Sequence, residues 1–413
     1  MFRRIAALIF IFVCTSIAWA ILGATVFTRT YKSAPGLREK VQSLWGSPQT
    51  QNPPDASYTY TVSKKTLTIV DGRSVERIMD EPVTDFLPLD STDLDVSLAL
   101  EHRQKGLLWY STYTVGFAGL YVFRNDTERE QSVSFTWHFP AEKAIYDDMS
   151  MWLDGQPLAY KSDKSSVQAT AHLAAGAART LKVSYRSQGL DTWRYEFGQN
   201  VSQVRNFSLR MSTNFRDIDF PDNALSPSEK RMTPGGWDLI WRYKNLVSGY
   251  DIAMAMPAKL QPGPLAGEIS YFAPVSLFFF FFVMFIITTL RGLELHPMNY
   301  FFLAAAFFAF HLLLAYLVDH ISIHLAFVIC SLVSIALVVS YLRLVLGMQF
   351  AAREAAIAQC IYLVLFSYAF FFKGFTGLAV TIGAILTLFV VMQATGRLNW
   401  SQQFRKVSAA PQA

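Results

Sequence analysis

The apolar residues of this chain are concentrated in two regions, one towards each end of the sequence. The first is a run at residues 5–27, and the second begins after Tyr271 and continues to about residue 395. A run of roughly 23 residues that rise 1.5 Å each is long enough to cross a ~30 Å hydrocarbon core. The first run therefore predicts an uncleaved membrane anchor, although "AWA" at 18–20 resembles the cleavage site of a signal peptide.

The second apolar region divides into five predicted membrane spans. Their bounds are 273–290, 298–318, 325–342, 355–372 and 377–395. Together with the N-terminal anchor, they predict six transmembrane helices in a multi-pass protein. A proline-stiffened connector is predicted at 259–267, immediately before the second span.

The segment between the anchor and the second span has ordinary polarity and a different pattern. A short amphipathic helix is predicted at 37–45, followed by a connector rich in Pro, Gln and Asn. Beyond it, period-two alternation dominates, for example at Val133, Phe135 and Trp137, which share one face of a predicted strand. Asp154-Gly155 lies between two short runs and predicts a hairpin, because both central positions of a type I′ turn need positive φ. Many short strands separated by turns predict a β-sandwich or two related β-modules.

These patterns together predict an α+β membrane protein, with six transmembrane helices and a large β-sandwich-like extracytoplasmic domain between the first and second helices. The predicted domains are an N-terminal transmembrane anchor (1–27), a periplasmic β-rich domain (28–270), a five-helix transmembrane domain (271–397) and a cytoplasmic tail (398–413).

Basic residues indicate the orientation of the chain in the membrane. With a cytoplasmic N-terminus, the cytoplasmic segments carry Arg3, Arg4, Arg291, Arg343, Arg353, Arg397, Arg405 and Lys406, whereas the short external loops carry Lys373 alone. This asymmetry follows the positive-inside rule and predicts that both termini are cytoplasmic. The formal net charge of +5 is thus a signal of topology and does not indicate a nucleic-acid partner.

Cysteine usage limits how the exported domain is stabilised. Cys14, Cys330 and Cys360 all fall within predicted spans, so the exported domain has no cysteine and depends on a hydrophobic core. We expect a bacterial inner (cytoplasmic) membrane protein that contacts the lipid bilayer and binds no cofactor.

Two features of the exported segment invite functional readings. The aromatic stretch at 106–126 suits either a binding groove around Trp109, Tyr110 and Tyr113 or, as we prefer, packing of a sheet core. Paired carboxylates suggest an envelope hydrolase, since glycoside hydrolysis uses two of them at a defined separation; the pairs are Asp93 with Asp95, Asp147 with Asp148, and Asp217 with Asp219. The sequence has no nucleophile elbow, P-loop or dinucleotide fingerprint, so a non-enzymatic role is favoured.

Within the membrane region, the polar residues of "FHLLLAYLVDHISIH" at 310–324 are the main candidates. His311 lies near the middle of its predicted span, where an ionisable residue is by default a functional hypothesis. A structural role is the preferred alternative, with a hydrogen bond across a helix interface to Ser331, Ser334 or Tyr316. Asp319 and His320 lie at the end of the same span, and a zinc site with His324 is a minor alternative.

A cytoplasmic turn, "LRGLELHPMNY" at 290–300, precedes this span. Pro297 suits the first turn of the next helix, His296 lies just before it, and Tyr300 suits the membrane interface. From Leu293 to Leu346, this turn and the following spans resemble the C-terminal membrane region of the CreD family of bacterial inner-membrane proteins. The matching positions are His296, Pro297, Met298, Tyr300, Asp319 and His320, whereas the family has an aromatic residue where this chain has His311.

The resemblance implies a role in cell envelope integrity and stress response, including altered tolerance to colicins and β-lactams, and it implies no catalytic mechanism. The leading hypothesis is a CreD-like protein whose periplasmic domain binds an unknown envelope protein or cell-wall component, with homo-oligomers possible. The first alternative is a transporter that uses polar residues in the C-terminal helices, mainly His311 and Gln359. The second alternative is the periplasmic envelope hydrolase.

Overall fold

The computed structural model describes residues 2–70, 73–106, 108–198, 203–372 and 374–396. The predicted cytoplasmic tail (398–413) lies outside these residues, as do Lys373 and Arg397. The chain divides into two compact units. The unit called here the membrane unit comprises Met1–Pro35, Gly106–Leu108 and Leu260–Ala413, and the unit called the β unit comprises Gly36–Lys105 and Trp109–Lys259.

Among the described residues, six helices are long and apolar enough to cross a membrane, which confirms the six predicted spans. They are α1 (Phe2–Trp45), α2 (Pro262–Leu290), α3 (Pro297–Leu317), α4 (Ile323–Leu346), the span Met348–Phe371 and α8 (Thr376–Thr395). The span Met348–Phe371 consists of α5 (Met348–Phe350), η1 (Ala351–Ala355), α6 (Ala356–Gln359), η2 (Cys360–Leu365), α7 (Phe366–Tyr368) and η3 (Ala369–Phe371). Its η1 and η2 turns are wider π-helical turns.

Two helix boundaries differ from the predictions. The helix predicted at 37–45 is the last part of α1, which continues through Pro35 without the predicted break. The predicted connector at 259–267 is largely helical, because α2 already begins at Pro262, a residue that suits the first helical position.

The packing of α2 against α1 explains why α2 begins early. A Cβ atom at Gly263 would lie 2.5 Å from the Thr30 hydroxyl, and one at Gly267 would lie 2.8 Å from the Phe27 ring. Glycines four residues apart therefore allow the two helices to approach closely, as small residues do in many membrane helix pairs. This tertiary contact favours helix in a segment whose local sequence suggests a linker.

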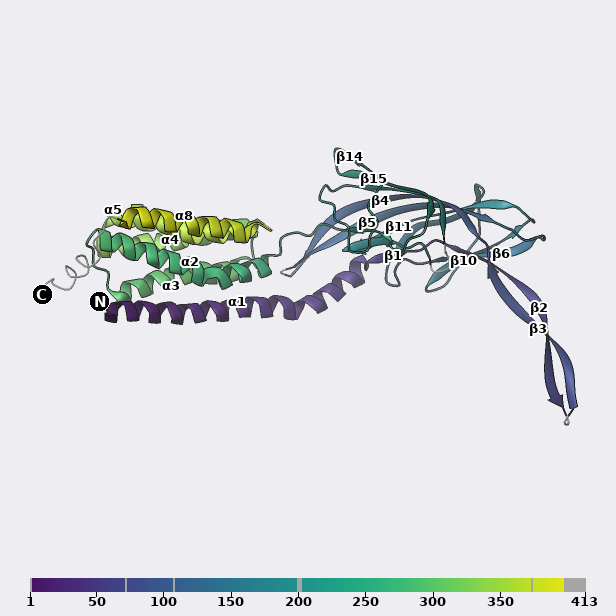
Figure 1. The fold of residues 1–413 in the computed structure, drawn as a ribbon, viewed down its shortest axis with the longest axis horizontal. Helices are drawn as coiled ribbons and strands as arrows, with labels where there is room; N and C mark the ends of the chain where they lie inside the picture. The colour runs from purple at the N-terminus through teal and green to yellow at the C-terminus, as the bar shows by residue number, and fades with distance from the viewer. Residues whose placement is uncertain (1, 71–72, 107, 199–202, 373, 397–413) are drawn as a thin grey trace. The chain divides into compact units, whose positions relative to one another are not determined.

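The β unit contains three sheets (Figure 1). The smallest has the order β1 (Gln49–Gln51), β12 (Thr192–Tyr195), β16 (Ile252–Ala255). The second has the order β3 (Arg73–Phe86), β2 (Asp55–Val70), β6 (Gln131–His138), β10 (Ser166–Leu173), β9 (Lys161–Ser162). The largest has the order β14 (Glu229–Met232), β15 (Trp237–Leu246), β13 (Val204–Thr213), β4 (Leu89–Lys105), β5 (Leu108–Arg124), β11 (Ala178–Leu190), β7 (Tyr146–Leu153), β8 (Gln156–Pro157).

The core of the β unit lies between the five-stranded and the eight-stranded sheets. The ring of Phe135 on β6 is 5.7 Å from Phe123 on β5, and the ring of Trp137 on β6 is 5.0 Å from Tyr185 on β11. All four side chains are almost completely buried. The sheets thus pack face to face, and the predicted α+β fold with a β-sandwich-like domain is confirmed.

Local predictions in the β unit are also confirmed. Asp154 and Gly155 both have positive φ, 47° and 80°, in the turn between β7 and β8. In the aromatic stretch, Tyr110 and Tyr113 are buried, and the Tyr113 hydroxyl donates a hydrogen bond to Thr192 O at 2.7 Å. These two rings therefore belong to the core and do not line an open groove.

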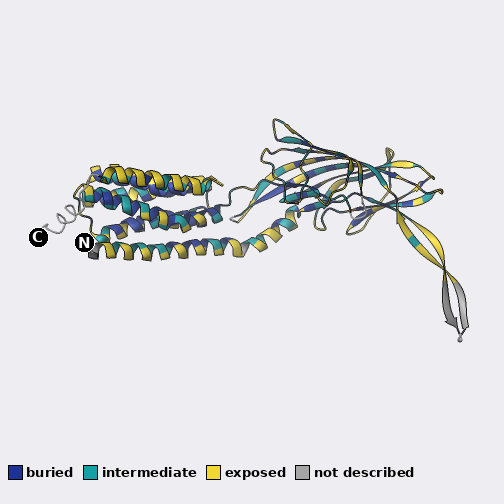
Figure 2. Cartoon of the chain, in the orientation of Figure 1, coloured by how far each residue is buried: buried dark blue, intermediate teal, exposed yellow. Residues whose placement is uncertain are grey.

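The spans differ in how much of their surface is buried in the membrane unit (Figure 2). α2, α3 and α4 each bury a continuous face. In α8, Thr387 is buried and the other residues are partly or fully exposed. The last span is thus attached to the bundle through a small contact area.

Candidate functional site

The predicted turn residues cap and pack helix α3. His296 precedes the helix, and its Nδ1 accepts a hydrogen bond from the Met298 backbone N–H at 3.3 Å. Pro297 is the first helical residue, where its missing N–H costs nothing. Tyr300 is completely buried, with its ring edge-to-face at 5.2 Å from Phe281 on α2. In this structure the Tyr300 ring therefore packs within the bundle.

His311 is completely buried, and it contacts a different helix from the one predicted. Its Nδ1 is 3.0 Å from Phe307 O in the same helix, which assigns the ring proton to Nδ1. The ring meets Trp19 of α1 edge-to-face, with centroids 5.6 Å apart and an interplanar angle of 82°. Among the described residues, Nε2 has no hydrogen-bond partner.

Among the described residues, the predicted hydrogen bond of His311 to Ser331, Ser334 or Tyr316 is therefore wrong. Ser331 donates to Phe327 O in its own helix, and Ser334 donates to Ala306 O. Both hydroxyls are engaged elsewhere, and the His311 ring packs against Trp19 of α1.

Asp319 forms an ion pair with Arg29 of α1. The two Arg29 terminal nitrogens lie 3.1 and 3.2 Å from the two carboxylate oxygens of Asp319. Arg29 also donates a hydrogen bond to Ala315 O at 2.7 Å, near the C-terminal end of α3, and its guanidinium is 5.3 Å from the Tyr316 ring centroid. This pairing was not predicted, although Arg29 closely follows the first apolar run and Asp319 ends another.

His320 does not join Asp319 in a metal site. It is exposed in the turn after α3, and the ring of His324 lies 5.1 Å from Phe371. Across the residues that the structure describes, no group of three or more His, Cys, Asp or Glu side chains is arranged to hold a metal ion. The polar stretch at 310–324 is thus several separate contacts and not one site.

A buried polar chain links three spans of the bundle. Gln359 Nε2 donates to Ser334 Oγ at 2.7 Å, and Ser334 Oγ donates to Ala306 O at 2.7 Å. Gln359 and Ser334 are fully buried, and Gln359 lies between the two wider turns η1 and η2. Gln359 was noted in the sequence as a polar residue of its span, but its link to Ser334 depends on tertiary packing.

The eight-stranded sheet has one face in the core and one open face, which carries a groove of about 340 Å³. On β4, Leu94, Val96 and Leu98 are buried, whereas Asp95 and Ser97 lie on the open face. The groove is lined by Asp95, Ser97, Gly116, Phe117, Ala118, Asp148, Ser184, Tyr185 and Arg186, which come from β4, β5, β11 and β7.

The floor of this open-face groove consists of small residues, and its walls are charged. A Cβ atom at Gly116 would lie 2.6 Å from Ser97 Oγ, so glycine keeps the floor low. Arg186 forms ion pairs with Asp148 and, at 3.5 Å, with Asp147. Asp148 adopts a positive φ of 53°, a conformation that aspartate tolerates better than most residues. The groove therefore offers carboxylate, guanidinium and hydroxyl groups above an uncrowded floor.

The helices and sheets define a multi-pass membrane protein with a large β-rich domain between its first and second spans. Over residues 269–401, the chain matches the family described as inner membrane protein CreD. The predicted resemblance to the CreD family is confirmed for this C-terminal membrane region, and the match supports a multi-pass inner-membrane location.

No relative among curated proteins matches the chain. Solved structures with limited similarity include a putative nutrient binding protein from Legionella pneumophila, at 10% identity and a TM-score of 0.32 over 47% of this chain and 74% of that chain. An M1 zinc metallopeptidase from Deinococcus radiodurans is 10% identical, with a TM-score of 0.24 over 40% of this chain and 42% of the peptidase. Leukotriene A4 hydrolase from Saccharomyces cerevisiae is 9% identical, with a TM-score of 0.21 over 40% of this chain and 29% of the hydrolase. Similarity at this level carries no functional argument.

Proposed function

We propose that this protein contributes to cell envelope integrity and to stress or antibiotic tolerance, as a non-enzymatic inner-membrane protein whose β unit binds an envelope component. The family match of the membrane region supports the envelope role. The observation that carries the binding role is the open-face groove of the eight-stranded sheet.

The groove chemistry suits recognition of a polar ligand. Asp95 and Arg186 present opposite charges, and Ser97 and Ser184 add hydroxyls that donate and accept hydrogen bonds. A floor without bulky side chains lets an extended ligand approach the sheet closely. The ligand class is an envelope protein segment or a cell-wall component that carries charges of both signs.

The proposed orientation places the β unit in the periplasm. Arg291 follows the end of α2, Arg343 is in the last turn of α4, and Arg353 is near the start of the next span. Since successive spans alternate in direction, these three residues lie on one side of the membrane, and basic residues favour the cytoplasmic side. Both termini are then cytoplasmic, and the ligand of the groove belongs to the periplasmic side of the envelope.

Two of the carboxylates considered for an envelope hydrolase, Asp95 and Asp148, line the groove. The ion pair of Asp148 with Arg186 suits charge recognition better than proton donation to a leaving group. The transporter alternative is also less well supported, because Gln359 and Ser334 hydrogen-bond within the bundle and no polar path connects them to His311 among the described contacts.

Deletion of the gene tests the proposed role. We expect deletion of the gene to change the tolerance of the strain to detergent, colicins and β-lactams. The wild-type gene should restore the original tolerance. Arg186→Ala should fail to restore it, whereas Arg179→Ala should restore it. Arg179 is the matched control, because it lies on the same strand and pairs with Asp154 outside the groove.

Immunoblots of membrane fractions check that both variants are present at wild-type levels. An unchanged phenotype of the deletion strain under all conditions contradicts the envelope role. Full complementation by Arg186→Ala contradicts the role of the groove but leaves the envelope role intact.

A further inference from the structure

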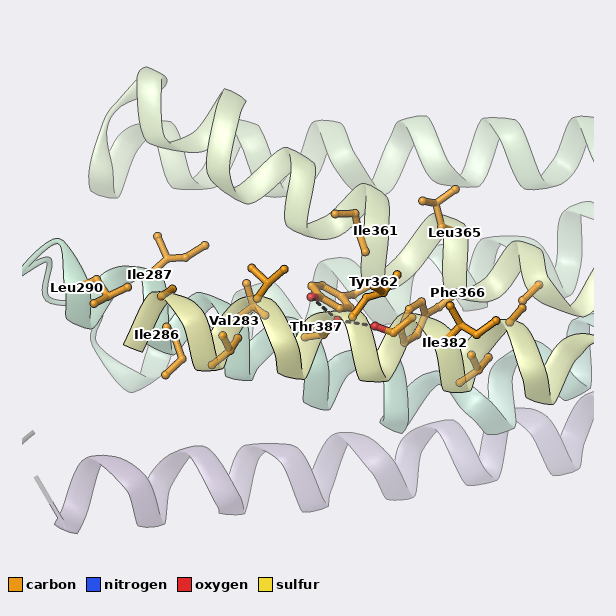
Figure 3. Close-up of a pocket in the computed structure, with 18 residues that line it drawn as sticks. Val283, Ile286, Ile287, Leu290, Ile361, Tyr362, Leu365, Phe366, Ile382 and Thr387 are labelled. Atoms are coloured by element: carbon orange, nitrogen blue, oxygen red, sulfur yellow. Dashed lines mark hydrogen bonds between the residues drawn. The ribbon is translucent and has the colours of Figure 1, made fainter. Parts of the chain in front are cut away.

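A second groove lies inside the membrane unit, between α2, the η2 and α7 turns, and α8 (Figure 3). Its volume is about 660 Å³, within the ~300–1,000 Å³ range of ligand pockets. Every lining residue belongs to a helix that qualifies as a membrane span. The groove therefore opens towards the hydrocarbon of the bilayer and not towards water.

The two hydroxyl groups in this intramembrane groove are already hydrogen-bonded. Thr387 Oγ1 donates to Gly383 O at 2.8 Å, so the Tyr362 hydroxyl, 2.9 Å away, is the donor to Thr387 Oγ1. Figure 3 shows this pair in the middle of an otherwise hydrocarbon lining. A buried water needs two to four polar partners, which this lining does not provide. An apolar occupant is thus favoured over water.

The small contact between α8 and the rest of the bundle also favours a bound molecule in the groove. A Cβ atom at Gly383 would lie 2.7 Å from the Phe366 ring, so this glycine lets α8 touch the neighbouring span. Around that contact, Ala379, Leu386 and Ala394 line the groove on one face of α8. An unfilled gap would deprive these side chains of dispersion contacts, and water cannot drive the helices together within a bilayer.

The dimensions of the groove distinguish between apolar occupants. The lining residues Ala379 to Ala394 extend over about 22 Å of α8 at 1.5 Å per residue. A volume of about 660 Å³ over that length corresponds to a mean cross-section of about 30 Å², whereas a helix 10 Å across occupies roughly 80 Å². A helix of another protein or of a second copy is ~10–12 Å across with its side chains, so it is too wide. A single hydrocarbon chain fits.

We propose that the intramembrane groove holds one acyl chain of a phospholipid, which completes the packing of α8 against α2 and the neighbouring span. The lipid is bound at a defined place and exchanges more slowly than the lipids that surround the bundle. This proposal is independent of the ligand of the β unit.

The full-length protein purified in mild detergent provides the test. Native mass spectrometry should detect one phospholipid retained per chain after extensive detergent washing. Ala394→Phe, which fills the groove, should reduce the retained fraction at least several-fold. Ala384→Phe is the matched control on the same helix, because Ala384 does not line the groove, and it should retain the lipid. Val390→Ala enlarges the groove without adding bulk and should also retain it.

A photoreactive phospholipid with a diazirine on its acyl chain locates the occupant. After reconstitution into vesicles of the same phospholipid, cross-links should concentrate on α2, the 361–369 segment and the lining face of α8. Two results would overturn the proposal: equal labelling of the lining and outer faces of α8, and equal loss of lipid from Ala384→Phe and Ala394→Phe. Either would show that lipid surrounds the bundle without binding at a defined place in the groove. Cross-linking of α8 to α8 of a second copy through the groove would overturn it as well.

Discussion

Arg29 of α1 and Asp319 after α3 form a two-point ion pair, with nitrogen–oxygen distances of 3.1 and 3.2 Å. The Arg29 and Asp319 side chains are 33% and 26% exposed, so water screens the pair in part. The same guanidinium binds the Ala315 carbonyl oxygen near the end of α3, where helix carbonyls lack partners within the helix. Arg29 thus links the first helix, which is distant in sequence, to the C-terminal end of α3.

We predict that this ion pair couples α1 to the bundle. Arg29→Gln and Asp319→Asn should each lower the free energy of unfolding, and a double-mutant cycle should give a coupling of about 1 kcal/mol or less, as for partly exposed pairs. Denaturant titration of the purified protein measures these values. Lys32→Gln is the matched control, because Lys32 is an exposed basic residue less than one helical turn away. Strict additivity of the two single variants would contradict the coupling.

His311 should tolerate replacement by another aromatic residue. Its ring fills a buried site beside Trp19, and phenylalanine keeps most of that volume and loses one hydrogen bond to Phe307 O. We expect His311→Phe to restore the phenotype of the deletion strain and to change thermal stability little, whereas His311→Ala should cost about 3 kcal/mol through the cavity it leaves. A stable but inactive His311→Phe protein would instead indicate chemistry within the membrane.

The buried polar chain predicts a difference between two serines of the same helix. Ser334→Ala should destabilise the bundle by about 1 kcal/mol, because both Ala306 O and Gln359 Nε2 lose a partner on other helices. Ser331→Ala should cost less, since among the described residues Ser331 bonds to Phe327 O alone, in its own helix. Thermal unfolding in one detergent compares the two variants. Equal losses of stability in the two variants would show that the interhelical hydrogen bonds of Ser334 stabilise the bundle no more than the intrahelical hydrogen bond of Ser331.

Acid stability should depend on Asp238 of the eight-stranded sheet. Hydrogen bonds from Arg210, together with its positive charge, hold the pKa of Asp238 below its ordinary value, against a smaller opposing effect of burial. A carboxylate with a depressed folded-state pKa adds stability that is fully present above its unfolded pKa and is lost as the pH falls through the folded-state pKa. The stability gap between wild type and Asp238→Asn should therefore narrow below about pH 4.

Thermal unfolding between pH 7 and pH 3 measures this gap. Arg210→Gln provides the companion variant, because it removes the group that lowers the pKa of Asp238 and should weaken the same pH dependence. A wild-type advantage over Asp238→Asn that stays constant down to pH 3 would contradict the assignment.

The sequence predicts the spans well and the helix ends poorly, for a physical reason. Crossing a bilayer requires long apolar runs, and these are visible in any window of the sequence. The start of α2 at Pro262 depends on tertiary packing, in which Gly263 and Gly267 meet α1. Local composition rich in Gly and Pro therefore suggests a connector where the structure has a helix.

The candidate sites were less predictable than the fold. The open-face groove combines Asp95, Gly116, Asp148 and Arg186 from four strands, and their spacing along the chain has no recognisable period. The direction of the His311 side chain was also not predictable, since a helical position has neighbours on several helices. By contrast, the roles of His296 and Pro297 at the start of α3 follow from local sequence, because caps depend on adjacent residues.

Occlusion of the open-face groove tests the proposed function most directly. Ala118→Trp places a bulky ring on the groove floor without changing any charge, and Thr114→Trp adds the same ring at an exposed position on the same strand outside the groove. The measurement is the β-lactam and detergent sensitivity of the deletion strain that carries each variant at wild-type abundance. We predict that Thr114→Trp restores wild-type tolerance and that Ala118→Trp leaves the deletion phenotype. Equal restoration by both variants would contradict binding of an envelope component in the groove.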